Sequence, residues 1–397
     1  MVKATAAQGY GTVKIKDVAS LAGVSTRSFY ELFDGKEDCF LRTHELLVRR
    51  AARGIIVAQA GEHGWRERLS LVFDAFARAL ENETDAVCLV TVDAYEAGPV
   101  ALEQARRAQS TIEAMIAETF VRAPDGILVP PLLVEGMVAA IACVIRTRFV
   151  AGRDQELPGL LDELREWAMC YPGKQVELAE LDSRSVATRS VSNRPLSSEG
   201  ALDSDRAVIL AAVAKLAAAD GYDTLTIPRI RRGAGVSRRI FDSHFDSVED
   251  CFIAVLEQRG GEAIEQAGRA QIAGRTWAGG IYRAIAVLAD RVANDPILAG
   301  VCLADTFPTD SRGSRCRKRL AGALTDQLIE SVPVEQRPSN LVIEASINAV
   351  WELLHKHVVR ASRQHRPQVA ATLAYLALAP LIGSYAAMAS ICKELEA

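Results

Sequence analysis

The sequence lacks the features of a secreted or disulfide-stabilised protein. None of its eight cysteines forms a Cys-x-x-Cys pair, and the opening residues MVKATAAQGYG hold no apolar run of the kind that a signal peptide needs. A chain of 397 residues can bury a sizeable core without cross-links. We therefore expect a cytoplasmic protein whose thiols act as small apolar side chains. The cysteines are Cys39, Cys88, Cys143, Cys170, Cys251, Cys302, Cys316 and Cys392.

Strong net charge and catalytic motifs are missing as well. The formal charge of -4 gives no overall attraction to nucleic acid or acidic membranes, so any such affinity must come from local patches. We find no nucleotide-binding loop, nucleophile motif or catalytic pair of carboxylates, and we expect neither an enzyme nor a cofactor. His355 and His357, with His365 further on, do not indicate a metal site, because residues two apart do not share a helix face.

Charge is absent from one long segment, between Arg366 and Lys393. The segment is long enough in principle to span a bilayer, but alanine dominates it and Pro380 and Gly383 break it. We interpret it as a buried interface helix rather than a membrane span.

An internal repeat organises the chain. Residues 9–41 and 221–253 align without a gap, at an offset of 212, with 16 identities in 33 positions. The offset also pairs residues outside this motif, such as Trp65 with Trp277 and Asp93 with Asp305. The sequence therefore predicts a tandem duplication.

The two copies are joined by a segment without apolar periodicity. Residues 172–203 are rich in serine and scattered charges, which predicts a solvated linker. A flexible chain of that length has a reach on the order of 30 Å, which is enough for the copies to pack together.

Helical patterns dominate both copies. Residues 67–80 carry an apolar stripe with helical spacing, and residues 206–222 form a helical pattern that a glycine ends. No alternating strand pattern appears. We predict an all-α fold of two tandem units, packed as a single-chain pseudo-dimer.

The sequence Ala-Gly-Val-Ser, at 22–25 and again at 234–237, fits a tight turn between two crossing helices. Gly23 would take the left-handed conformation, and Ser25 would cap the next helix. On that helix Phe29 and Phe33 would face the core, so Arg27 and Glu31 would face outward. A short exposed helix of this kind suits the major groove of DNA.

The local charge supports such a partner. Residues 1–53 carry nine Lys and Arg against six Asp and Glu, a balance of +3. The helix that opens near Asp34 offers backbone N–H groups and Lys36 as a phosphate anchor.

The stretch IKDVASLAGVSTRSFYELFDGKEDCF resembles the helix-turn-helix of TetR/AcrR-type transcriptional regulators. The resemblance implies that Thr26, Arg27 and Ser28 approach bases, and that Tyr30 and Lys36 hold phosphates. Beyond about residue 60 it is one of architecture only, and it implies a helical core that binds a small ligand and dimerises through its last two helices.

The first copy departs from this pattern in two ways. Only about eight residues precede Gly9, so helix 1 is clipped, for which a misassigned start is one explanation. Lys14 also takes the usual Ser/Thr cap position of helix 2, which Thr226 fills in the second copy.

The second copy keeps the scaffold but changes the residues around it. Asp242 replaces Tyr30 and Val248 replaces Lys36, while residues 228–239 hold five arginines and no acid. Two interpretations stay open: a second reader with a different half-site, or a worn pseudo-head. The candidate DNA-binding residues of both copies are Lys14, Lys16, Ser25, Thr26, Arg27, Ser28, Tyr30, Lys36, Thr226, Arg231, Arg232, Ser237, Arg238 and Arg239.

Several aromatic residues are candidates for ligand pockets, although each also fits an ordinary core position. They are Phe73, Phe76, Tyr95, Phe120, Tyr282, Phe307 and Trp351. The basic cluster from Arg312 to Arg319 lies far from either motif in sequence, and we interpret it as a solvated helix face.

These patterns favour a transcription regulator, specifically a repressor, that a small molecule releases from DNA. The predicted domains are a head at 1–53 and a core at 54–171, the linker, a second head at 204–265 and a second core at 266–397. The expected partners are an asymmetric DNA operator, a small effector and, through further homodimerisation, a second chain. The alternative is an interaction module derived from such a regulator that no longer binds DNA.

Overall fold

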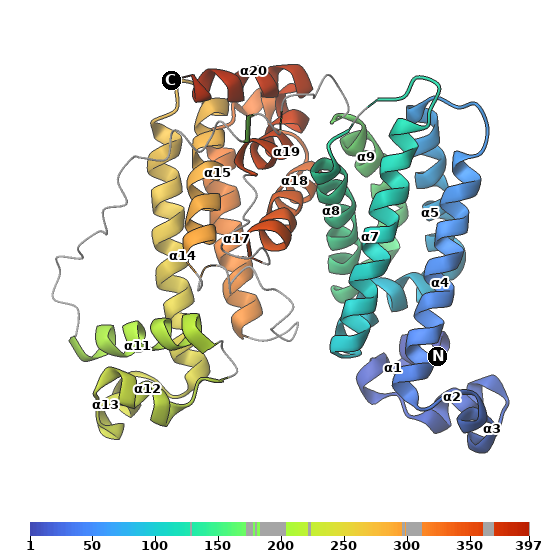
Figure 1. The fold of residues 1–397 in the computed structure, drawn as a ribbon, viewed down its shortest axis with the longest axis horizontal. Helices are drawn as coiled ribbons and strands as arrows, with labels where there is room; N and C mark the ends of the chain where they lie inside the picture. Colours follow the sequence, from blue (N-terminus) through green and yellow to red (C-terminus); the bar gives the residue numbers. More distant parts are fainter. Residues whose placement is uncertain are drawn as a thin grey trace. The chain divides into compact units, whose positions relative to one another are not determined.

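The computed structural model describes residues 1–127, 129–171, 178, 181–182, 204–220, 224–295, 298, 312–359 and 369–396. These residues form helices and turns, and no strand occurs among them, which confirms the all-α prediction (Figure 1). The chain divides into two compact units. Unit 1 is Met1–Val176 with Pro338–Ala349 and Gly383–Tyr385, and unit 2 is Glu177–Arg337 with Val350–Ile382 and Ala386–Ala397.

Unit 1 begins with three short helices and continues with longer ones. The helices from the first sequence copy are α1 (Val2–Thr12), α2 (Ile15–Ala22), α3 (Thr26–Leu32), α4 (Lys36–Gln59), α5 (Trp65–Cys88), the π-helix η1 (Leu89–Asp93), α6 (Ala94–Glu96), α7 (Pro99–Val121), α8 (Pro131–Val150), the 3-10 helix η2 (Asp154–Glu156) and α9 (Leu157–Met169).

The second sequence copy repeats the order of the first five helices. Its helices are α11 (Ser204–Asp220), α12 (Ile227–Ala234), α13 (Arg238–His244), α14 (Val248–Ile272), α15 (Trp277–Asn294), α17 (Arg312–Glu330), η5 (Val334–Gln336), α18 (Asn340–Leu353), the π-helix η6 (Leu354–Val359), α19 (Ala370–Ile382) and α20 (Ser384–Leu395).

The first turns of α18 pack within unit 1, although they come from the second sequence copy. Glu344 accepts two hydrogen bonds from the Arg148 guanidinium, at 2.8 and 2.6 Å, and the Trp167 indole N–H donates to the Ser346 hydroxyl at 3.0 Å. Two parallel charge-assisted bonds fix orientation as well as distance. These contacts attach the segment to α8 and α9.

The first helix of each copy differs in length. α1 contains a kink at Gly9 (φ 72, ψ 150), so its regular part ends before that residue, whereas α11 has 17 residues. This agrees with the predicted short first helix of copy 1. Gly221 and Tyr222, the predicted end of the α11 pattern, lie outside the described residues.

Most of the predicted linker, 172–203, lies outside the described residues, but Leu178, Leu181 and Asp182 are buried. The Asp182 carboxylate accepts hydrogen bonds from the Ala371 N–H at 2.6 Å and the Thr372 hydroxyl at 2.7 Å. A carboxylate at a helix start pairs with N–H groups that the helix itself leaves unsatisfied. These three residues therefore differ from the solvated linker that the sequence predicts.

The uncharged segment near the C-terminus is buried from Val369 to Ala379, as predicted, whereas its later part includes exposed residues such as Tyr385. Every residue from Ala370 to Ala379 is buried in α19. The predicted break at Pro380 is wrong, because the helix continues to Ile382 and ends at Gly383, whose φ of +79° no ordinary helix residue adopts. Of the helices in the described ranges, none is both long enough and apolar enough to span a bilayer.

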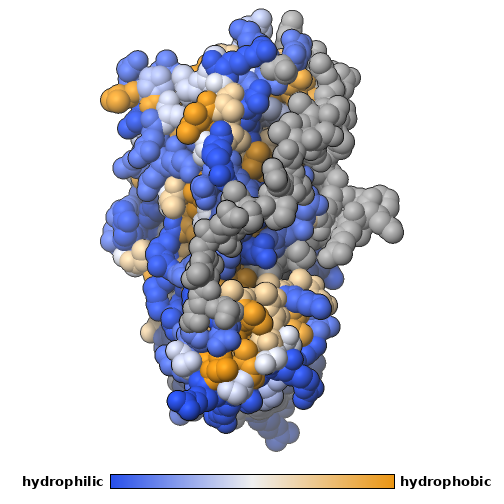
Figure 2. Space-filling view, turned by 90° about the vertical axis from the view of Figure 1, so that its left-hand side faces the viewer, coloured by the Kyte–Doolittle hydropathy of each residue, from blue (hydrophilic) through white to orange (hydrophobic). Residues whose placement is uncertain are grey.

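One face of unit 2 is largely hydrophilic, with hydrophobic side chains gathered toward the end where α11, α12 and α13 lie (Figure 2). Val208 of α11 is 44% exposed, and its neighbours Ala207 and Ala211 are exposed as well. Thus α11 presents an apolar surface beside α12 and α13.

Candidate DNA-binding surface

The turn between the second and third helices has the same geometry in both copies. Gly23 and Gly235 lie in the left-handed region, with φ of +67° and +69°. The hydroxyl of Ser25 accepts a hydrogen bond from the Ser28 N–H at 3.0 Å, and that of Ser237 accepts from the Ile240 N–H at 3.2 Å. The predicted left-handed glycine and serine cap are confirmed in both places.

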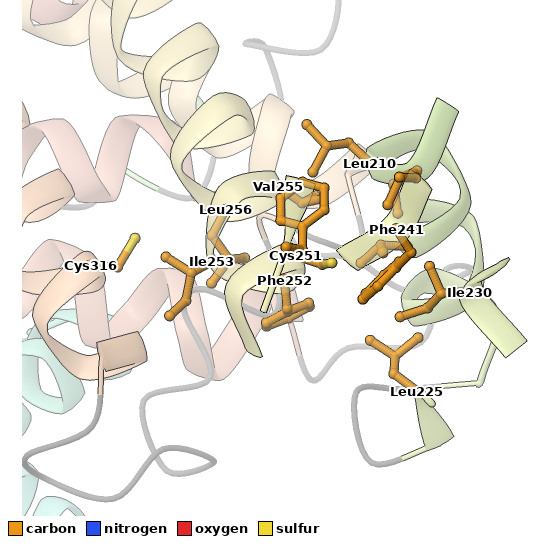
Figure 3. Close-up of a cluster of buried hydrophobic side chains, with 14 residues drawn as sticks. Leu210, Leu225, Ile230, Phe241, Cys251, Phe252, Ile253, Val255, Leu256 and Cys316 are labelled. Atoms are coloured by element: carbon orange, nitrogen blue, oxygen red, sulfur yellow. The ribbon is translucent and has the colours of Figure 1, made fainter. Parts of the chain in front are cut away.

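The phenylalanines of the third helix face inward, as predicted. Phe29 is buried and packs beside Phe33, with ring centroids 5.2 Å apart. In the second copy Phe241 and Phe245 are both buried, and Phe241 points toward the start of α14 (Figure 3). The inward face of each short helix is thus scaffold, and its outward face is free for other uses.

The outward face of α3 presents Arg27, whose side chain is 90% exposed and whose Nε lies 3.3 Å from Glu31 Oε1. Thr26 beside it is exposed. Ser28 is half-buried, and its hydroxyl lies 3.0 Å from that of Ser25, so it belongs to the helix cap as much as to the surface.

The residues in front of α3 add exposed cations. Lys14 and Lys16 are both exposed at the start of α2. The Lys14 N–H donates to the Asp17 carboxylate at 3.0 Å, so α2 is stabilised from its third residue although lysine cannot cap it.

Tyr30 and Lys36 are placed differently from each other. The Tyr30 side chain is 60% exposed on the outer face of α3. The Lys36 ammonium is half-buried: it donates to the Tyr10 carbonyl at 3.0 Å and lies 4.2 Å from the centre of the Tyr10 ring. Lys36 thus ties the start of α4 to α1, which leaves its remaining two N–H groups for a phosphate.

The cap that Thr226 was predicted to supply does not form, because its side chain makes no capping hydrogen bond. Pro228, the second residue of α12, has no N–H to donate to it.

The arginines of α12 differ in their surroundings. Arg229 pairs with Asp220 instead of facing a ligand. Arg232 is exposed, whereas Arg231 is half-buried, and its Nε is buried without a hydrogen-bond partner among the described residues.

The outward face of α13 carries two exposed arginines, Arg238 and Arg239. Arg238 Nε lies 3.3 Å from Asp242 Oδ2, with side-chain exposures of 77% and 52%. Val248, which replaces the lysine of copy 1, packs against the apolar cluster of this head.

The aromatic candidates of unit 1 do not line a common pocket among the described residues. Phe120 is fully buried and packs on Trp65, with centroids 5.6 Å apart. Phe73 is buried and Phe76 half-buried in α5. Tyr95 is exposed, and the guanidinium carbon of Arg146 lies 4.4 Å from the centre of the Tyr95 ring.

Unit 2 contains a small apolar cavity of about 30 Å³, room for about one or two water molecules. Trp351 lines it, whereas Tyr282 is buried elsewhere in α15, and Phe307 lies outside the described residues. The lining residues are Gly260, Ala263, Ile264, Leu288, Val292, Leu298, Leu320, Leu324 and Trp351.

The basic side chains Arg312, Arg315, Lys318 and Arg319 of α17 are exposed, as predicted, and two of them also form ion pairs. Arg312 pairs with Asp250 and Arg319 with Glu257, which join α17 to α14. The side chain of Arg317 lies outside what is described. In the described part of the chain no group of His, Cys, Asp and Glu side chains could hold a metal ion; His365 falls outside that part.

The sequence patterns did not predict a buried carboxyl where α1 packs against η1. Asp93 is buried, and burial raises its pKa to about 6, although a hydrogen bond from Thr5 of α1 opposes the shift. His44 of α4 is also buried, which lowers its pKa, and its Nδ1 lies 3.2 Å from the Gln104 amide of α7.

Two segments of the chain match one protein-family model, described as bacterial regulatory proteins, tetR family. The matched residues are 2–43 and 209–255, which run from α1 into α4 and from α11 into α14. No curated protein sequence matches the chain. The family consists of DNA-binding transcriptional regulators, and the match assigns this class of function to the chain. The chain therefore carries two tandem segments that each match the tetR family model, in agreement with the resemblance and the duplication that the sequence predicts.

Proposed function

We propose that the chain is a cytoplasmic repressor that reads an asymmetric operator with two unlike heads and leaves DNA when a small molecule binds. One observation carries the proposal: the two turns share their glycine and serine geometry, yet the exposed residues beside them differ. A shared scaffold with altered outward residues is what two readers of different half-sites require.

The two heads would act together as a single-chain pseudo-dimer. Dimeric helix-turn-helix proteins place their reading helices about 34 Å apart, on half-sites one helical turn apart. Support comes from the segment of α18 inside unit 1, where the Arg148–Glu344 and Trp167–Ser346 contacts attach residues of the second sequence copy to α8 and α9.

Ligand control would be transmitted along α14. This helix begins in the second head, where Cys251 is part of the apolar cluster, and its residues Gly260 and Ala263 line the cavity. Because the cavity is too small for more than water, an effector would favour a widened core and shift the head away from its DNA-binding position.

A binding titration on the DNA upstream of the gene tests the DNA-reading part of the proposal. Arg27→Ala and Arg239→Ala should each weaken binding about 5- to 150-fold, the range expected when one arginine–base contact is lost. Arg49→Ala, which removes an exposed arginine of α4, is the matched control and should change binding little. If neither reading-helix variant weakens binding, the reading helices are wrongly assigned.

A second candidate function is an interaction module that has lost DNA. The observation that favours it is the replacement of Tyr30 and Lys36 by Asp242 and Val248 in the second head. Phosphate contacts make DNA binding salt-dependent, so a selection from random duplexes that yields no salt-dependent binding would support the module and contradict the repressor.

A further inference from the structure

The helices α3 and α13 each carry an arginine–carboxylate pair, but the two pairs occupy different positions on their helices. The caps Ser25 and Ser237 align the helices. Arg27, paired with Glu31, is the second residue of α3, whereas Arg238, paired with Asp242, is the first residue of α13. A shift of one residue turns the pair by about 100° and moves it about 1.5 Å along the axis.

Paired substitutions produce this shift. Arg27 is retained as Arg239, but Glu31 is replaced by Ser243, whose hydroxyl donates to the Ile240 carbonyl at 2.7 Å. Thr26 is replaced by Arg238, and Tyr30 by Asp242. Random wear removes charged pairs, whereas here one complete pair is lost and another complete pair is gained one residue away.

Folding does not account for the pairs. Their side chains are 90% and 62% exposed in α3 and 77% and 52% exposed in α13. Exposed ion pairs of this kind contribute little to stability. Arg27 and Glu31 lie on the face of α3 opposite the buried Phe29, whereas the exposed Arg238 and Asp242 lie about 60–100° round α13 from the buried Phe241. Both pairs are therefore exposed where bases would be read, but on different sides of their helices.

A carboxylate one helical turn away restricts the rotation of the arginine side chain, so the N–H groups of the guanidinium point in a fixed direction. Arginine recognises guanine through O6 and N7 with two parallel hydrogen bonds, which require a fixed fork.

We propose that Glu31 and Asp242 are specificity-determining positioning residues, and that the pairs Arg27–Glu31 and Arg238–Asp242 each read a guanine at a different place in their half-sites. The inference rests on the proposed function, and it identifies the second head as a reader. Asp242 is then the partner of Arg238 rather than a mark of wear.

The test is a selection of random duplexes by the full chain, followed by binding measurements on the selected site with each base replaced. Glu31→Gln should lower the guanine preference about tenfold at one position of one half-site. Asp242→Asn should do the same in the other half-site. Binding to random duplex should stay equal or become tighter in both variants, because each removes a negative charge.

Matched controls are Glu45→Gln and Glu265→Gln, which remove carboxylates from similar exposed pairs on α4 and α14. They should leave every base preference unchanged. A chain with Thr26→Arg, Tyr30→Asp and Glu31→Ser should transfer the preference of the second head to the first.

The outcomes separate the two proposals. A wild-type chain that selects no sequence contradicts the proposed function and this inference together. A wild-type chain that selects an asymmetric site, with preferences that Glu31→Gln and Asp242→Asn leave intact, contradicts the inference alone. An effect of Glu31→Gln without one of Asp242→Asn also overturns it, because the second head would then not read through its pair.

Discussion

Gly23 and Gly54 show how backbone conformation decides what a single residue does. A Cβ at either position would meet no atom within 4 Å, so space does not distinguish them. Gly23 has a φ of +67° in the turn, whereas Gly54 lies inside the helix α4. The sequence predicted the role of Gly23, because its position before a capping serine calls for a left-handed residue.

The two alanine variants should therefore have opposite signs. Gly23→Ala should lower the free energy of unfolding by about 1 kcal/mol, because L-residues avoid the left-handed region. Gly54→Ala should raise it by about 0.5–1 kcal/mol through better helix propensity. Urea denaturation of both variants measures this, and a stabilising Gly23→Ala would show that the turn does not hold this conformation.

At the scale of elements, the sequence predicted helices well and their junctions poorly. Residues 67–80 and 206–220 lie in α5 and α11, because apolar spacing reports the face that a helix buries. The π-helix η1 and the burial of Asp93 in it could not be predicted. They depend on packing between α1 and η1, and one acid in a mixed sequence has no periodic signal.

The Asp93 joint should make stability depend on pH. Its pKa is raised from 3.8 to about 6, so the folded chain holds this proton more tightly than the unfolded chain. The stabilisation that the protonated Asp93 carboxyl gives the folded chain is complete below about pH 4, falls as the pH rises toward 6 and is absent above that. A difference of about two pKa units corresponds to about 3 kcal/mol.

Asp93→Asn should therefore flatten this part of the profile. Relative to wild type, the variant should gain stability between pH 4 and pH 8 in urea denaturation series. The matched control is Asp85→Asn, which replaces an exposed carboxyl near the end of α5 and should leave the profile unchanged. If the wild-type profile matches that of Asp93→Asn, the pKa of the Asp93 carboxyl is not raised in the folded chain.

At the scale of the whole molecule, the repeat was the strongest signal in the sequence. It predicted the helix-turn-helix geometry in both copies. The offset of 212 residues pairs a turn, two phenylalanines and a helix start in the same order, and a similar composition alone would not produce that match. It could not predict that the first turns of α18 pack in unit 1. That placement depends on contacts of Arg148 with Glu344 and of Trp167 with Ser346, which are 196 and 179 positions apart in the sequence.

The central claim is that two unlike heads in one chain read one asymmetric operator. The most direct test takes the site that the chain selects and replaces one half-site by an inverted copy of the other. Affinity of the full chain is then measured by fluorescence anisotropy at fixed salt. The account predicts that both palindromes bind at least tenfold more weakly than the selected site, since each mismatched base pair costs about 1–3 kcal/mol. Equal or tighter binding to either palindrome would contradict it.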